Sequence, residues 1–105
     1  MRSIGIAFMA SVTLVLAARA LAAGPARVDI QDFRYGPTEV TVPVGTPVTW
    51  TNHDEEPHTI TSTTGAFASA GLAHDDTFTQ TFTRPGRYAY FCALHPQMKA
   101  TVVVR

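Results

Sequence analysis

The chain has 105 residues, and its 8 basic and 8 acidic side chains balance to a formal net charge of zero at pH 7. Nucleic-acid binding needs a basic stripe or patch, which this composition does not supply, so no nucleic acid is expected as a partner. A chain of this length is also too short for two separate hydrophobic cores. Its one cysteine, Cys92, excludes a disulfide within the chain.

Residues 1–23 predict a secretory signal peptide. Arg2 precedes an apolar run over Ile4–Ala18, and small residues then end the segment. A basic start, an apolar middle and a small-residue end are the three parts of such a signal. The alternative is an uncleaved membrane anchor, but the run is short for a bilayer span and Arg19 closes it. We therefore expect residues 24–105 to form one exported, periplasmic domain outside the membrane.

Short strands separated by turns are predicted along the rest of the chain, because apolar and polar residues alternate with a period of two. In chain order, the expected strands are Val40–Val44, Val48–Asn52, His58–Thr61, Thr77–Thr83, Tyr88–Cys92 and Val102–Val104. The segment from Thr63 to Asp76 is rich in small residues and predicts a loop with one short strand at Phe67. No stretch has helical periodicity. The pattern indicates an all-β fold, an antiparallel sandwich or barrel.

Two polar regions are expected to be solvated loops without a chemical role. One is the acidic run over 54–56, together with His53 just before it. The other is the loop that contains His74. Either histidine could bind a divalent ion weakly, but neither has the surroundings of a ligand in the sequence.

Cys92 is expected to point inward at one end of the fold. It shares a strand face with Tyr88 and Tyr90, because side chains two residues apart lie on the same side of a strand. That face must be the core if the tyrosines are to be buried. The thiol would then lie where the strand gives way to a loop, within reach of neighbouring strands.

A potential metal site follows from Cys92, His95 and Met98, which are spaced by three residues, with His58 upstream. A thiolate, two imidazoles and a thioether are the ligand set of a mononuclear blue-copper site, in which His₂Cys lies in a trigonal plane and Met is a long axial ligand. Ligation would also protect a lone thiol in an oxidising compartment. The sequence therefore predicts one copper ion and a one-electron carrier.

Other interpretations of these residues are weaker. A buried lone cysteine is often a small hydrophobe, and a methionine is often core filler. Zinc accepts His₂Cys, but a structural zinc site normally recruits a fourth strong ligand instead of methionine. Cys92 and His95 could also be a nucleophile and its base. No third orienting group or oxyanion hole is evident, so the protein is not expected to be an enzyme.

Several longer motifs carry a resemblance to a known family. They are Phe33-x-Tyr35-x-Pro37, Val40-x-Val42-x-x-Gly45-x-x-Val48-x-Trp50-x-Asn52-x-Asp54, Pro57-His58, Gly86-x-Tyr88-x-Tyr90-x-Cys92 and Cys92-x-x-His95-x-x-Met98. With them the chain resembles the cupredoxins, the plastocyanin and azurin superfamily, over nearly all of residues 24–105. The short spacing before the methionine is similar to that of small bacterial amicyanin-like members.

This resemblance implies a Greek-key β-sandwich of about seven to eight strands, with one type 1 copper ion at one end. The implied ligands are His58, Cys92, His95 and Met98. It further implies a protein that carries electrons between periplasmic redox partners, such as a c-type cytochrome or a dehydrogenase, which dock near His95. A monomer is expected because the sequence lacks a long apolar surface stripe. The alternative with the same ligands is a periplasmic copper-binding or delivery protein without redox turnover.

Three positions depart from the family pattern. Thr59 replaces the asparagine that ties the two ligand loops together in better-known members, and its hydroxyl could form the same link with a shorter reach. Gln97 makes the patch around His95 more polar than usual. Phe91 stands where plant plastocyanins have a surface tyrosine, so a second electron route through a tyrosine is not expected.

Overall fold

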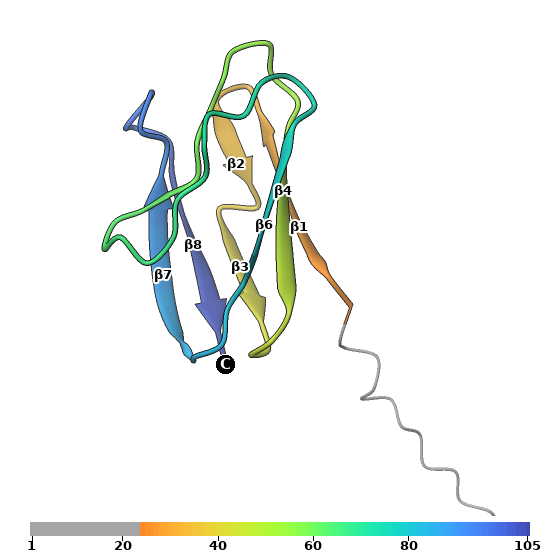
Figure 1. Ribbon diagram of the computed structural model, residues 1–105, viewed down its shortest axis with the longest axis vertical. Helices are drawn as coiled ribbons and strands as arrows, with labels where there is room; N and C mark the ends of the chain where they lie inside the picture. The colour runs from red at the N-terminus through yellow and green to blue at the C-terminus, as the bar shows by residue number, and fades with distance from the viewer. Residues whose placement is uncertain (1–23) are drawn as a thin grey trace, which may run out of the picture.

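Two four-stranded sheets face each other in residues 24–105, the part of the chain that the computed structural model describes (Figure 1). The strand order in the first sheet is β2 (Arg34–Gly36), β1 (Ala26–Gln31), β4 (Pro47–Asn52) and β6 (Thr77–Thr81). In the second sheet it is β3 (Glu39–Val42), β8 (Lys99–Val104), β7 (Gly86–Phe91) and β5 (Thr61–Ser62). The prediction of an all-β sandwich of seven to eight strands is confirmed.

The predicted signal peptide, residues 1–23, lies outside the described residues. Within residues 24–105, no helix is long and apolar enough to cross a membrane.

Both sheets are mixed, so the expectation of a purely antiparallel fold was wrong. β1 and β4 run parallel, as do β3 and β8. The cause lies in the connections: the chain leaves the first sheet after β2, forms β3 in the second sheet, and returns as β4 beside β1. The strand β1 itself was not predicted, although its buried residues Val28 and Ile30 alternate with polar ones as a half-buried strand requires.

The core between the sheets is built from the inward-facing residues of both. Trp50 of β4 is fully buried, and its Nε1 donates a hydrogen bond of 3.0 Å to the Tyr90 hydroxyl of β7. Tyr35 of β2 packs edge-on against Tyr90, with ring centroids 4.7 Å apart. These contacts join the two sheets, and the expected inward face of Tyr90 and Cys92 is confirmed by their exposures of 1% and 0%.

Two expected strands differ from the structure. The segment from His58 to Ile60 is buried but is not a strand, because its amides bond to side chains and loops instead of a ladder. Only Thr61–Ser62 pairs regularly, as β5. Phe67 belongs to the core and lies beside an isolated bridge between Thr61 and Ala68, so the short strand predicted there is wrong.

Candidate metal centre

Three of the four predicted ligands meet at one end of the sandwich. The donor atoms of His58, Cys92 and His95 all lie within 4.8 Å of one another. The Cys92 Sγ is 3.8 Å from the His58 Nδ1 and 3.7 Å from the His95 Nδ1. His58 and Cys92 are fully buried, whereas His95 is partly exposed.

The loop from Cys92 to Met98 is closed by its own backbone. The His95 amide donates to the Cys92 carbonyl at 3.2 Å, and the Met98 amide donates to the His95 carbonyl at 2.9 Å. The Cys92 amide in turn donates to the Met98 carbonyl at 3.1 Å. Met98 is buried, with 3% exposure, and belongs to the core. Its role as the axial ligand stays a prediction.

The distances from the Cys92 Sγ to the two imidazole nitrogens fit a single metal ion held between these donors. With bonds of about 2.0 Å to nitrogen and about 2.3 Å to sulfur, at about 120° to each other, sulfur and nitrogen would lie about 3.7 Å apart. The two sulfur–nitrogen distances of 3.8 and 3.7 Å match this value. A thiolate with two imidazoles is a soft donor set, which suits copper. The geometry of the residues therefore fits the predicted cofactor.

His58 is fixed in the orientation that a metal ligand needs. Its Nε2 donates to the Asp54 Oδ2 at 2.8 Å, which leaves the Nδ1 lone pair directed toward Cys92. Its backbone exchanges two hydrogen bonds with Leu72, of 3.1 and 2.8 Å. A carboxylate on the second nitrogen of a ligating histidine fixes both its tautomer and its ring orientation.

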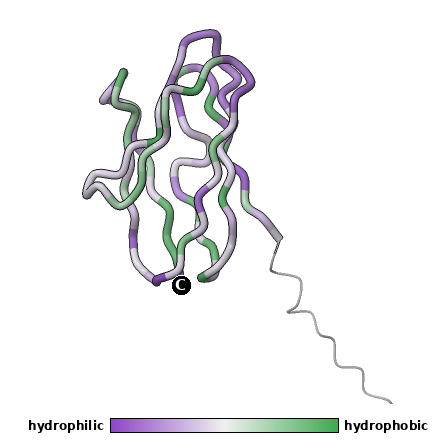
Figure 2. The backbone as a smooth tube through the Cα atoms, in the orientation of Figure 1, coloured by the Kyte–Doolittle hydropathy of each residue, from purple (hydrophilic) through white to green (hydrophobic). Residues whose placement is uncertain are grey.

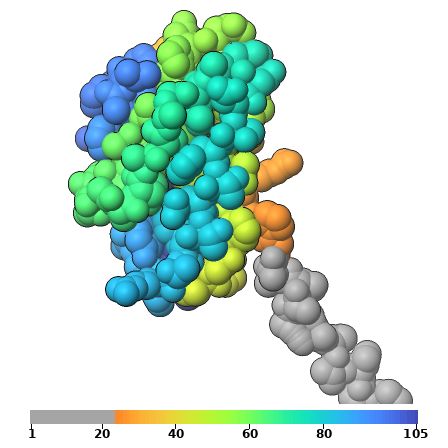
Figure 3. All heavy atoms as spheres, viewed as in Figure 1, coloured from red at the N-terminus to blue at the C-terminus, as the bar shows by residue number. Residues whose placement is uncertain are grey.

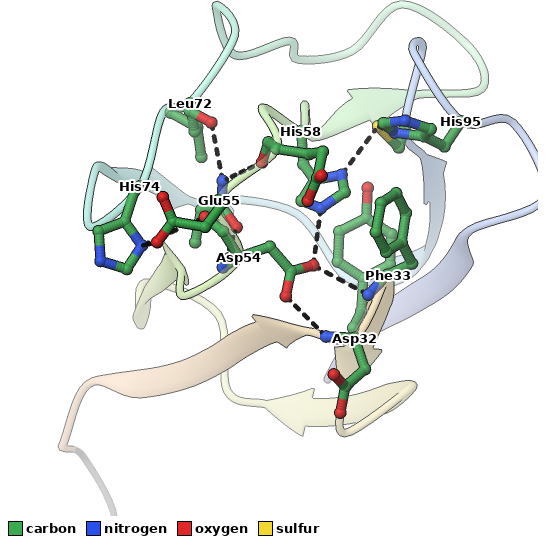
Figure 4. Close-up of polar contacts among 12 residues, drawn as sticks. Asp32, Phe33, Asp54, Glu55, His58, Leu72, His74 and His95 are labelled. Atoms are coloured by element: carbon green, nitrogen blue, oxygen red, sulfur yellow. Dashed lines mark hydrogen bonds and ion pairs between the residues drawn. The ribbon is translucent and has the colours of Figure 1, made fainter.

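Asp54 was predicted to be part of a solvated loop, and that prediction was wrong. Its side chain is only 11% exposed and accepts hydrogen bonds from the amides of Asp32 and Phe33, at 2.8 and 2.9 Å (Figure 4). Burial alone raises the pKa of Asp54, but these two amides and His58 outweigh it and hold the pKa below its usual range. The sequence signal was the four-residue spacing between Asp54 and His58.

Phe33 is a second residue of the site that the sequence reasoning did not assign. Its ring meets His58 and His95 edge-on, with centroid distances of 4.9 and 4.8 Å. Asp32 and Phe33 both have left-handed backbone angles, with φ of 55° and 58°, and the Asp54 carboxylate binds both of their amides. Few residues other than glycine adopt these backbone angles. The Asp54 carboxylate therefore both stabilises this turn and orients His58.

Thr59 links the two ligand loops, as predicted. Its hydroxyl accepts a hydrogen bond of 2.7 Å from the Ala93 amide, next to Cys92. Its own amide donates to the Cys92 Sγ at 3.3 Å, so Thr59 contacts both ligand loops. Its carbonyl accepts a bond of 2.5 Å from the Tyr35 hydroxyl. Burial, followed by the charge of Cys92, raises the pKa of Tyr35 well above its usual range, so this donor keeps its proton.

His53 and His74 lie outside this group, on the exposed surface where they were predicted. His53 contacts Asp29 at 2.9 Å. His74 lies 3.2 Å from the Asp54 carbonyl and 3.3 Å from the Asp75 carboxylate. The bond to the Asp54 carbonyl is the main reason why the pKa of His74 is raised.

Comparison with known proteins agrees with this fold and site. The chain matches the model of the Cupredoxin-like domain over residues 4–104, and it therefore belongs to the cupredoxin-like family.

Amicyanins are among its relatives. The amicyanin of Paracoccus denitrificans is 37% identical over 93 residues, which cover 84% of this chain and 71% of that protein. Amicyanin-alpha of Methylorubrum extorquens is 35% identical over 105 residues, which cover 90% and 88%. The solved structure of a reduced Cu(I) form of an amicyanin mutant superposes with a TM-score of 0.74 at 33% identity, covering 86% of this chain and 90% of that one. The predicted resemblance is confirmed.

Proposed function

We propose that this protein binds one copper ion in a type 1 site and acts as a mobile one-electron carrier between periplasmic redox partners. The observation that carries this proposal is the group of His58, Cys92 and His95, assembled at one point with two members fully buried. Met98 is the proposed fourth, axial ligand. The cofactor is copper, which when bound supplies cycling between Cu(II) and Cu(I) and so stores and releases one electron.

The residues around the ligands favour rapid electron exchange because they fix the site in advance. Asp54 orients His58, and Thr59 joins its loop to the loop that begins at Cys92. Ligands that are held by such outer contacts keep their positions when the charge on the metal changes. Little atomic rearrangement is then required, which is the condition for fast transfer between proteins.

His95 is the proposed point at which the electron leaves. It is the partly exposed member of the group; the exposed residues Leu94 and Pro96 flank it in the chain, and the Phe33 ring contacts it. Leu94 is 52% exposed and Phe33 is 38% exposed. A small apolar patch over the exit suits brief encounters with a c-type cytochrome or a dehydrogenase better than a permanent complex.

We do not propose an enzyme, because the predicted ligand set leaves no position for a substrate. Catalytic metal sites keep one coordination position open for water or substrate. With Met98 as the fourth ligand beside two imidazoles and a thiolate, that position is filled. The amicyanin relatives support the same conclusion.

Copper delivery is the alternative function with the same ligands, but the contacts of His58 favour electron transfer over delivery. A delivery protein must release its ion easily, whereas His58 is fully buried and is held by Asp54 and Leu72. These contacts favour retention of the metal through many redox cycles.

Stopped-flow mixing of the reduced, copper-loaded protein with oxidised cytochrome c tests the proposal. We expect fast second-order reduction of the cytochrome, with copper retained on the protein afterwards. If the cytochrome stays oxidised while copper passes readily to an apo-acceptor protein, delivery replaces electron transfer as the function.

A further inference from the structure

We propose that the copper end of this protein docks a redox protein with a basic surface, through an apolar contact at Phe33 and Leu94 that acidic loops flank on one side. This inference rests on the proposed function and adds the chemistry of the partner to it. The partner class is a carrier whose own electron-transfer edge is surrounded by lysine or arginine.

The apolar part of this surface lies over the proposed electron exit. Three large hydrophobic residues of the described chain are strongly exposed, namely Phe33, Val44 and Leu94. Two of them, Phe33 and Leu94, belong to the copper end: Phe33 contacts the His95 ring, and Leu94 precedes it in the chain. Val44 lies at the other end, where its amide bonds to the Arg105 carbonyl.

The acidic part adjoins Phe33 through a continuous set of contacts. The Asp54 carboxylate binds the Phe33 amide, and the Asp54 carbonyl lies 3.2 Å from the His74 ring. His74 also approaches Glu55 at 3.6 Å and Asp75 at 3.3 Å. Figure 3 shows the yellow-green segment around residue 55 and the teal segment around residue 75 together at one end of the molecule. The side chains of Glu55 and Asp75 are 83% and 72% exposed.

These two loops are held together from inside by Asn52, which is fully buried. Its Nδ2 donates to the carbonyls of Glu56 and Leu72, both at 2.9 Å, and its Oδ1 accepts from the Asp54 amide at 2.9 Å. Its backbone bonds to Asp75 and Asp76 at 2.7 and 3.0 Å. The acidic groups therefore keep a fixed position relative to the apolar patch, and they need little ordering when a partner binds.

Charge is distributed unevenly along the molecule. The copper end carries six of the eight acidic residues: Asp32, Asp54, Glu55, Glu56, Asp75 and Asp76. Only Arg34 and Lys99 are basic residues next to site residues in the chain. Arg84, Arg87 and Arg105 gather at the far end, where Gly86 pairs with Val104 and Gly45 bonds to Phe82. Figure 2 shows the polar loops at the top of the view, away from the C-terminus.

This uneven distribution of charge favours a partner with a basic surface. Opposite charges steer two proteins into the productive orientation and raise the association rate, an effect that falls steeply with ionic strength. A second copy of this chain would bring two acidic ends together and is disfavoured. An acidic partner would be repelled by the same side of the patch.

The test compares one cytochrome in two charge states. Stopped-flow rates are measured between the reduced, copper-loaded protein and either a basic cytochrome c or the same cytochrome with its lysines succinylated. With the basic form, we expect the rate constant to fall about tenfold or more between about 10 and about 300 mM salt. With the succinylated form, the rate should be lower at low salt and should rise as salt is added.

Variants locate the effect on the surface. Glu55→Gln/Glu56→Gln/Asp75→Asn should lose about tenfold in rate toward the basic cytochrome at low salt, with an unchanged copper spectrum. The single variants Glu55→Gln and Glu39→Gln are matched controls of equal charge change. Glu39 pairs with Arg87 at 3.1 Å, away from the copper end, so its variant should change the rate much less than Glu55→Gln does.

A rate toward the basic cytochrome that is independent of salt, or equal in the triple variant, overturns the inference. Faster exchange with the succinylated form also overturns it and indicates an acidic partner instead. Ferricyanide separates these results from failure of the proposed function. If the protein reduces ferricyanide but is indifferent to cytochrome charge, only the docking inference fails; if it reduces neither cytochrome nor ferricyanide, the proposed carrier function fails and the inference falls with it.

Discussion

His58 and His95 both approach Cys92, at 3.8 and 3.7 Å, but the protein holds them in different ways. His58 is fully buried and bonds through its side chain to Asp54 and through its backbone to Leu72. His95 lies on a short loop, is partly exposed, and meets the exposed ring of Phe33. In the proposed copper site, His58 is therefore the ligand held inside the protein, and His95 is the ligand that reaches the surface.

Replacing each histidine by glycine should show the difference between the two positions most clearly. His58→Gly opens a space inside the protein, whereas His95→Gly opens one toward the solvent. We expect added imidazole to restore an intense Cu(II)–thiolate absorption band to His95→Gly and not to His58→Gly. Equal rescue of the two variants would contradict the difference in access.

Removal of the Asp54 carboxylate, which bonds to His58, should weaken metal binding. Loss of an outer partner of a ligating histidine typically reduces metal affinity by about 10- to 100-fold, and we expect a loss of this size for Asp54→Asn. Competition with a chelator of known affinity measures it. The control is Asp29→Asn, whose partner His53 is not a predicted ligand; it should leave the affinity unchanged.

The same carboxylate gives the metal-free protein a pH dependence of known sign. The pKa of Asp54 is lowered in the folded state. Its contribution to the free energy of unfolding is therefore complete above the unfolded-state pKa, and it is lost as the pH falls through the folded-state pKa. Urea unfolding should therefore show less stability below about pH 4, and Asp54→Asn should make that decline shallower. A steeper decline in the variant would contradict the assignment.

The hydrogen bond between Thr59 and Ala93, which links the two ligand loops, should have a smaller effect than the carboxylate of Asp54. Thr59→Val removes the acceptor for the Ala93 amide and keeps the shape of the side chain. We expect the free energy of unfolding to fall by about 1 to 3 kcal/mol, since a partly buried donor loses its partner. Thr59→Ser keeps the hydroxyl and should recover most of this loss. Urea unfolding of the metal-free proteins measures both.

The smallest stability effect should come from the exposed side. Phe33→Ala removes the edge-on contacts of the Phe33 ring with the rings of His58 and His95. Each such ring pair contributes about 0.5 to 1.5 kcal/mol to the free energy of unfolding. With Phe33 38% exposed, we expect a loss near the lower end of that range. The control Val44→Ala removes a similarly exposed hydrophobe at the far end. Phe33→Ala should slow electron transfer to cytochrome c, and Val44→Ala should not.

The features that sequence reasoning found are local in the chain. Alternation with a period of two predicted most strands and the inward face of Cys92, because neighbours in a strand decide which side is buried. The three-residue spacing from Cys92 through His95 brought two donors into one loop, and the structure adds His58 to them. Thr59 was also predicted, since it adjoins a predicted ligand.

The features that it missed depend on which segments pair. Asp54 lies 22 and 21 residues from the two amides that it binds, and apart from its four-residue spacing to His58 nothing local distinguishes it from a solvated acid. Phe33, in the turn between β1 and β2, reaches the histidines only because β1 pairs with β4, whose end leads into the loop of Asp54. The parallel pairs likewise follow from long connections between sheets, which alternation does not encode.

We propose that Cys92 would hold the copper ion together with His58 and His95, and the visible absorption spectrum of the Cu(II)-loaded protein tests this proposal most directly. We expect an intense thiolate-to-copper charge-transfer band that gives the protein its colour and is lost in Cys92→Ser. A pale protein, or a band that survives in Cys92→Ser, would show that Cys92 is not a ligand of Cu(II) and would contradict the account.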